Sequence, residues 1–305
     1  MNHREKKDAE IIRKALEGSE TDEKSLINIA GKRTHKERMK IRQSYKALFQ
    51  KDLMSVFISD LSADFKIIML ALFTDPVEYD ADCIYRAIKD SDEETLIEIF
   101  VSRPGWYLNK IKDLYLEKYK KDLEEHLRGD SSDDLRRLLV LLIQGKRSSN
   151  KNPDKEKCQK FAKDLYESGE KKLGIDEELF NKIFVLSSPY ELIEISREYH
   201  KLSEKLLTTA IDGEFSGNIK KLLKSTLYAN ISPSEYFATR IHDSIDGFGE
   251  NKNALTRIIV TRVEIDLPKI KEYYNKLYGK DMVENIKERL SGNYLNLLIA
   301  ICNLA

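Results

Sequence analysis

The sequence predicts an all-α protein, and three observations support this prediction. Gly (13) and Pro (6) are scarce among 305 residues, so the residues that most often interrupt helices are rare. Apolar residues recur at the spacing of one buried helix face, as in Ile11, Ile12, Ala15 and Leu16. One arrangement of helices and turns is repeated four times along the chain. We therefore expect short helices joined by tight turns, and neither a β-sandwich nor a β-barrel.

Each of the four repeats is marked by two turns. An acidic helix start opens the second helix, where it suits the positive end of the helix dipole. The four opening turns are Thr21-Asp-Glu23, Ser91-Asp-Glu93, Ile175-Asp-Glu177 and Glu250-Asn-Lys252. A second turn, rich in small residues, precedes the last helix. The four closing turns are Leu61-Ser-Ala-Asp-Phe65, Ser131-Ser-Asp-Asp-Leu135, Phe215-Ser-Gly-Asn-Ile219 and Leu290-Ser-Gly-Asn-Tyr294.

The spacing of these marks predicts five helices in each repeat. In the first repeat the periodicity favours helices over residues 8–17, 22–32, 35–48, 51–60 and 62–73, and the last is apolar nearly all round. We expect repeats over 1–75, 76–147, 157–230 and 231–305. Residues 148–156 lie in the only long polar stretch with Gly, Ser and Pro, which predicts a linker that divides the chain into two halves of two repeats each.

Composition excludes several classes of function. Lys+Arg (52) equals Asp+Glu (52), whereas a nucleic-acid-binding protein needs a surplus of basic residues. No catalytic motif is present, so we expect neither an enzyme nor a small-molecule substrate. Three widely spaced cysteines favour a reducing compartment, and no apolar stretch is long enough to span a membrane. We expect a cytoplasmic protein that reaches membranes only peripherally.

The repeat pattern resembles the annexin family over essentially the whole chain. The family's turn, Lys/Met-x-Gly-x-Gly-Thr-Asp-Glu, is present in altered form as Leu16-Glu-Gly-Ser-Glu-Thr-Asp-Glu23 and Ile245-Asp-Gly-Phe-Gly-Glu250. Its third-repeat variant is present as Gly169-Glu-Lys-Lys-Leu-Gly-Ile-Asp-Glu177. The altered motifs are most similar to those of a divergent protist branch such as the alpha-giardins. The resemblance implies the annexin fold, with four repeats of five helices each in a slightly curved array.

The resemblance also implies calcium-dependent binding to acidic phospholipid membranes. A calcium ion takes six to eight oxygen ligands, and a glycine turn can direct backbone carbonyls to one point while a later carboxylate supplies charge. In repeat three, Gly169, Lys172 and Gly174 occupy the carbonyl positions, and Glu214 lies 40 residues after Gly174. This repeat retains the most complete set of predicted calcium ligands.

The first repeat retains the carboxylate but lacks one glycine. Its carbonyl positions fall on Leu16, Gly18 and Glu20, and Asp60 lies 40 residues after Glu20. A non-glycine residue in a left-handed turn conformation costs about 1–2 kcal/mol, so this turn is expected to be strained or differently shaped. Thr21 and Glu23 are candidates for a minor side site.

Repeats four and two each lack an essential part. Repeat four offers the carbonyls of Ile245, Gly247 and Gly249, but Arg289 occupies the carboxylate position and would repel a cation. In repeat two, residues 88–95 are two residues shorter than the matching stretch of repeat one and contain no glycine, although Asp130 persists. We expect no calcium in repeat two and treat repeat four as a weaker candidate.

Three further features bear on partners. Lys171, Leu173 and Phe248 lie on the candidate turns and are predicted membrane contacts. Trp106 follows a Pro-Gly turn, where partial burial between repeats is favoured over a role as an interfacial anchor. The basic segment 31–42 is interpreted first as a solvated face, and second as a surface for acidic lipid or the acidic tails of a filament.

An ordinary structural interpretation stays open for every candidate turn, because glycine often ends helices and acidic residues often begin them. A different function also stays open. A structural adaptor that kept the scaffold, lost most of its calcium dependence and binds cytoskeletal proteins would explain the altered turns of repeats two and four.

Overall fold

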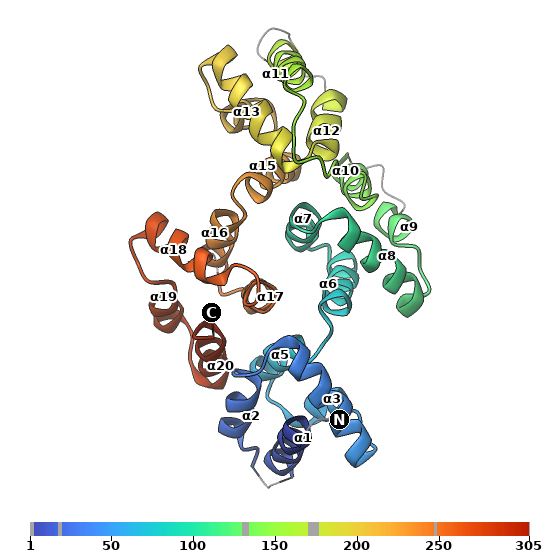
Figure 1. Cartoon of the computed structure of the whole chain (residues 1–305), viewed down its shortest axis with the longest axis vertical. Coiled ribbons are helices and arrows are strands. Elements are labelled where there is room, and N and C mark those ends of the chain that lie inside the picture. Colours follow the sequence, from blue (N-terminus) through green and yellow to red (C-terminus); the bar gives the residue numbers. More distant parts are fainter. Residues whose placement is uncertain (1–2, 18–19, 130–133, 170–176, 247–248, 305) are drawn as a thin grey trace. The chain divides into compact units, whose positions relative to one another are not determined.

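The computed structural model describes residues 3–17, 20–129, 134–169, 177–246 and 249–304. Within these ranges the chain forms twenty α-helices and no strand, which confirms the all-α prediction. Figure 1 shows these helices in chain order. None of the described helices is both long and apolar enough to cross a membrane.

The helices fall into four successive groups of five, as the repeat pattern predicted. The first group is α1 (His3–Leu16), α2 (Glu23–Ala30), α3 (His35–Phe49), α4 (Leu53–Asp60) and α5 (Ala63–Leu72). The second is α6 (Pro76–Asp90), α7 (Glu93–Ser102), α8 (Gly105–Tyr119), α9 (Leu123–Arg128) and α10 (Asp134–Ile143). The third is α11 (Lys155–Gly169), α12 (Glu177–Leu186), α13 (Pro189–Ser203), α14 (Leu207–Glu214) and α15 (Gly217–Ile231). The fourth is α16 (Pro233–Asp246), α17 (Lys252–Arg262), α18 (Leu267–Tyr278), α19 (Met282–Arg289) and α20 (Gly292–Cys302).

The third helix of every repeat ends at a residue in the left-handed conformation. The residue that follows α3, α8, α13 and α18 has φ of 54°, 55°, 57° and 65°. In each case its backbone N–H donates to the carbonyl four residues earlier, which stops the helix and turns the chain toward the fourth helix. Only Gly279 of repeat four is a glycine, whereas Gln50, Lys120 and Glu204 adopt this conformation at a steric cost.

The repeats pair in an order that differs from the order along the chain. One compact unit comprises Met1–Tyr79 with Phe237–Ala305, and the other comprises Asp80–Tyr236. The first and fourth repeats therefore share one core, and the second and third repeats share another. In the first unit α20 packs against both α2 and α5 (Figure 1). In the second unit α15 packs against α7 and α10.

Polar contacts at helix starts join the paired repeats. In the first unit the Asn293 amide donates to the Glu23 carboxylate, and Lys252 pairs with Asp64 at 2.6 Å. In the second unit the Asn218 amide donates to Glu93. Each contact joins the start of a second helix to the start of a fifth helix from the other repeat. Each fifth helix buries an apolar face between the two repeats of its unit.

The linker does not divide the chain into halves, so that prediction is wrong. Its first residue packs within the second unit, where the Ser148 N–H donates to the Leu186 carbonyl at 2.9 Å. The residues just before it do the same: Arg147 donates to the Phe184 carbonyl at 3.4 Å, and a Cβ on Gly105 of α8 would lie 2.7 Å from the carbonyl oxygen of Gly145. The polar stretch therefore joins the second and third repeats inside one unit.

Candidate functional site

The turn between the first and second helices is closed by one backbone hydrogen bond in the three repeats where the structure describes it. The bond runs from Asp22 N–H to the Ala15 carbonyl at 2.9 Å in repeat one, and from residue 251 to residue 244 at 2.8 Å in repeat four. In repeat two the equivalent bond runs from Asp92 to Ala87 at 2.9 Å. The repeat-two turn is thus two residues shorter, as its sequence predicted, and has no room for a loop of carbonyls.

An Asp or Asn side chain fixes the start of the second helix directly after each of these turns. Asp22 and Asp92 accept hydrogen bonds from the N–H groups of Ser25 and Thr95, each at 3.1 Å. Asn251 does the same in repeat four. The hydrogen bonds from the side chain and N–H of Ser25 lower the pKa of Asp22. These caps anchor the turns at the end of a stable helix.

In repeats one, three and four the residue at the carboxylate position ends the fourth helix, while Asp130 of repeat two lies outside the described residues. Asp60 ends α4, Glu214 ends α14, and Arg289 ends α19. The next residue closes each helix through its N–H, as Phe215 does to the Ile211 carbonyl at 3.0 Å. The 40-residue offset seen in the sequence therefore corresponds to one structural position.

Among the described residues, no lysine pairs with Glu214 or Asp60. Within the described residues no side chain forms a hydrogen bond or ion pair with Glu214, and Asp60 accepts only from the Ser59 hydroxyl at 2.5 Å. Lys224 and Lys220 pair instead with Asp212, and the hydrogen bond from Lys224 lowers the pKa of that carboxyl group. Both candidate ligands are therefore carboxylates with coordination sites to spare.

The remaining predicted ligands of repeat one lie on an exposed or half-buried turn. Glu20 is exposed, Leu16 and Thr21 are half-buried, and Gly18 lies outside the described residues. Glu23 is also half-buried, and it accepts the hydrogen bond from Asn293 of repeat four. Its carboxylate is thus already used in the contact between the two repeats.

Much of the repeat-three turn lies outside the described residues. Gly169 is the last residue of α11, and Lys171, Lys172, Leu173 and Gly174 are not described.

Repeat four is described on both sides of its turn. Ile245 is buried, Gly249 is exposed with φ of 113°, and Gly247 and Phe248 lie outside the described residues. A φ of this size strains any side chain, so the turn needs its glycine at position 249.

The repeat-four turn contains an acidic residue whose role the sequence pattern did not reveal. Asp246, the last residue of α16, lies 2.5 Å from a guanidinium nitrogen of Arg289. This contact places the end of the fourth helix directly against the end of the first helix. The feature of the sequence that could have revealed this contact is the opposite charge of Asp246 and Arg289, which stand at two turns of the same repeat.

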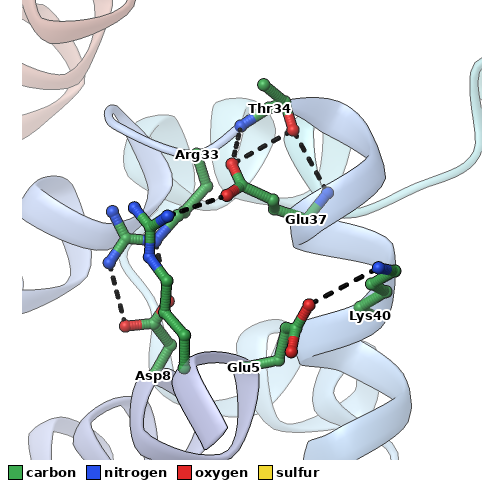
Figure 2. A network of polar contacts seen from close by, with 7 residues as sticks. Glu5, Asp8, Arg33, Thr34, Glu37 and Lys40 are labelled. Carbon is green, nitrogen blue, oxygen red and sulfur yellow. Dashed lines mark hydrogen bonds and ion pairs between the residues drawn. The ribbon is translucent and has the colours of Figure 1, made fainter. Parts of the chain in front are cut away.

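Internal ion pairs neutralise much of the basic segment 31–42. Figure 2 shows Arg33 facing Asp8, with bonds of 2.7 and 3.0 Å, and Lys40 facing Glu5 at 3.6 Å. Arg38 is only 1% exposed and donates to the Ala30 carbonyl, so it is not part of the solvated face that the sequence suggested. These ion pairs join the segment to α1. A negatively charged partner would therefore meet far less positive charge here than the composition suggests.

Trp106 differs from its expected burial. It is 63% exposed at the start of α8, where its ring packs edge-on against Tyr107 and the Lys110 ammonium lies 5.2 Å from the ring centre. The Pro-Gly turn that precedes it places the ring outside the stripe of α8 that faces the core.

Known proteins share this arrangement of repeats. The sequence model of the Annexin family matches residues 7–72, 79–142, 160–225 and 236–301. Human annexin A11 is 36% identical over 298 residues, which cover 97% of this chain but 59% of annexin A11, so the chain spans about three fifths of that relative. The structure of annexin III superposes with a TM-score of 0.95 at 34% identity, over 98% of this chain and 93% of the other. Calcium-bound alpha-14 giardin has a TM-score of 0.85 at 20% identity, over 97% and 99% of the chains, and shares the fold. The chain belongs to the annexin family.

Proposed function

We propose that this protein binds acidic phospholipid membranes in a calcium-dependent manner, from the cytoplasm and without enzymatic activity. Annexins in general bind calcium and phospholipid. The observation that carries the proposal for this chain is that Glu214 and Asp60 end equivalent helices, where no described cation pairs with either carboxylate. Each lies at the position from which the family's turn would receive its acidic ligand.

Repeat three would hold the main calcium ion. Its ligands would be the backbone carbonyls of Gly169, Lys172 and Gly174 with the carboxylate of Glu214. Bound calcium would supply a divalent positive charge, and oxygens of lipid phosphate would complete its set of ligands. The described part of the site is the two helix ends, at Gly169 of α11 and at Glu214 of α14. Lys171 and Leu173, on the same turn, would face the lipid.

Repeat one would hold a second ion between the carbonyls of Leu16, Gly18 and Glu20 and the carboxylate of Asp60. The side site of Thr21 and Glu23 would hold a further ion. An ion there would have to compete with the hydrogen bond from Asn293 to Glu23.

Repeat four keeps the carbonyls of Ile245, Gly247 and Gly249 but has Arg289 at the acidic position. Phe248 of this turn would contact lipid without a calcium ion beneath it.

Vesicle sedimentation over a calcium titration tests the assignment. Glu214→Gln should raise the calcium concentration needed for half-maximal binding to phosphatidylserine vesicles by on the order of tenfold, because calcium affinity follows the number of charged ligands. Asp212→Asn is the matched control. It also removes one negative charge, two residues before Glu214, but the Asp212 carboxylate is already paired with Lys220 and Lys224. The double variant Glu214→Gln/Asp60→Asn should lose most binding, since the two sites act together. The site would be ruled out if Glu214→Gln needed the same calcium concentration for half-maximal binding as the natural protein, or if Asp212→Asn raised that concentration as much as Glu214→Gln.

A second candidate function is a cytoskeletal adaptor with reduced calcium dependence. The short turn of repeat two and Arg289 in repeat four favour it, because both remove calcium ligands. Co-sedimentation with microtubules or actin filaments in chelator, without vesicle binding in calcium, would support this alternative.

A further inference from the structure

Arg289 stands where the other repeats have a carboxylate, and it is bound to an acidic partner in its own repeat. Its guanidinium lies 2.5 Å from a carboxylate oxygen of Asp246 and is half exposed. Asp246 ends the first helix of the repeat, and Arg289 ends the fourth. The ion pair therefore joins the two chain segments that a calcium ion would otherwise bridge.

Asp246 is held firmly on the side that faces away from Arg289. Its second carboxylate oxygen accepts from the Asn285 amide at 3.1 Å and lies 3.2 Å from Nδ1 of His242. Asn285 is buried and also donates to the Tyr274 hydroxyl at 2.6 Å, while the His242 ring stacks on Tyr278 at 3.7 Å. The carboxylate is thus fixed by groups from the first, third and fourth helices of the repeat.

Repeat one shows the opposite arrangement of charge. The backbone bond that closes the first turn runs from residue 22 to residue 15 in repeat one and from residue 251 to residue 244 in repeat four. Glu17 is therefore the residue equivalent to Asp246. Glu17 pairs with Arg13 of its own helix, so it does not reach across to the fourth helix. At the equivalent of Arg289 stands Asp60, which pairs with no cation among the described residues. The same two positions therefore hold two acids in repeat one and an acid with a base in repeat four.

We propose that Arg289 acts as a built-in cation that takes the place of calcium in repeat four. The guanidinium bridges the two turns by its ion pair with Asp246 and repels a divalent ion from the carbonyls of Ile245 and Gly249. The turn of repeat four is then held in chelator as well as in calcium. The sequence keeps the glycine turn, so repeat four would contain a latent calcium site that one residue blocks. The inference rests on the proposed calcium-dependent function of the other repeats.

The test adds a carboxylate at position 289 to a protein whose other sites are silent. In the Glu214→Gln/Asp60→Asn background, Arg289→Glu should restore calcium-dependent sedimentation with phosphatidylserine vesicles, whereas Arg289→Gln should not. Equilibrium dialysis with radioactive calcium and the same vesicles should count about one more bound ion for the Glu variant than for the Gln variant. Equal binding by the two variants would overturn the inference.

Two further measurements keep the inference testable if Arg289→Glu folds poorly. Calcium should raise the Tm of that variant more than the Tm of Arg289→Gln, because two facing carboxylates repel each other until a cation joins them. In chelator, the amide hydrogen of Asn251 should exchange at least about tenfold faster in Arg289→Gln than in the natural protein, because the ion pair no longer holds the turn. Equal exchange would contradict the bridging role. Absence of calcium-dependent binding by the natural protein would instead refute the proposed function and leave this exchange measurement as the deciding one.

Discussion

Replacing Asp80 with asparagine tests the buried ion pair that joins the first two helices of repeat two. Arg103 donates to both carboxylate oxygens of Asp80, from Nε at 2.8 Å and from a terminal nitrogen at 3.1 Å. The Asp80 side chain is 0% exposed and that of Arg103 is 7% exposed. Asparagine keeps the shape but removes the charge that the buried guanidinium binds with two hydrogen bonds, so we expect a loss of about 3–5 kcal/mol in the free energy of unfolding.

Repeat one provides an internal comparison. Asp8 and Arg33 form the same two-bonded pair between the first helix and the end of the second, but Arg33 is 16% exposed. Water can therefore solvate part of the guanidinium after the pair is broken. Asp8→Asn should cost less than Asp80→Asn, about 1.5–3 kcal/mol, which is the range for hydrogen bonds to charged groups.

Urea unfolding measures these differences. Trp106 is the only tryptophan and lies in the unit that contains Asp80, so its fluorescence follows that unit, while circular dichroism follows the whole chain. The double variant Asp80→Leu/Arg103→Met should recover part of the loss expected for Asp80→Asn, because it removes both charges of the pair, but buried Glu98 then loses the attraction of Arg103. The reasoning would be refuted if Asp80→Asn cost less than about 1 kcal/mol, or if the double variant were no better than the single one.

Three other predictions concern stability and reactivity. Gly105→Ala places a Cβ 2.7 Å from the Gly145 carbonyl oxygen and should destabilise by about 1–3 kcal/mol in urea unfolding, whereas Gly213→Ala has free space and should stabilise by about 0.5–1 kcal/mol. Burial raises the pKa of Cys158 to about 11 and of Cys302 to about 12, so a disulfide reagent at pH 8 should modify these thiols only after unfolding. Burial also lowers the pKa of His126, so the unfolded chain binds that proton first and stability should fall as pH drops below about 6.5. His126→Gln should reduce this pH dependence.

Local structure was largely predictable from the sequence, because helix periodicity and helix caps act over a few residues. The first repeat was expected to form helices over 8–17, 22–32, 35–48, 51–60 and 62–73, and α1 to α5 match all five. The largest difference is at the N-terminus, where α1 begins at His3. Polar residues continue that helix because Glu5 and Asp8 are buried against the basic segment that follows α2 (Figure 2).

The pairing of repeats was not predictable from local pattern. It depends on contacts such as Asn293 with Glu23, which lie 270 residues apart, and Lys252 with Asp64, which lie 188 apart. A polar linker indicates where two repeats are connected, but it does not indicate whether those repeats share a core or belong to different units. The apolar faces of α5, α10, α15 and α20 decide the pairing, because each needs a partner from another repeat.

The candidate site was predictable where it depends on spacing and not where it depends on a new partner. The 40-residue offset correctly placed Asp60, Glu214 and Arg289 at one structural position. That Arg289 opposes calcium stays a prediction. The sequence did not reveal that Asp246 binds Arg289, because an ion pair between two turns becomes visible only when the fold brings them together.

Sedimentation of the natural protein with phosphatidylserine-containing vesicles tests the central claim most directly. The protein should pellet with the vesicles in millimolar calcium, return to the supernatant when a chelator is added, and stay in solution with vesicles of phosphatidylcholine alone. Protein that stays in solution with phosphatidylserine vesicles at every calcium concentration, or that pellets equally in chelator, would contradict the account.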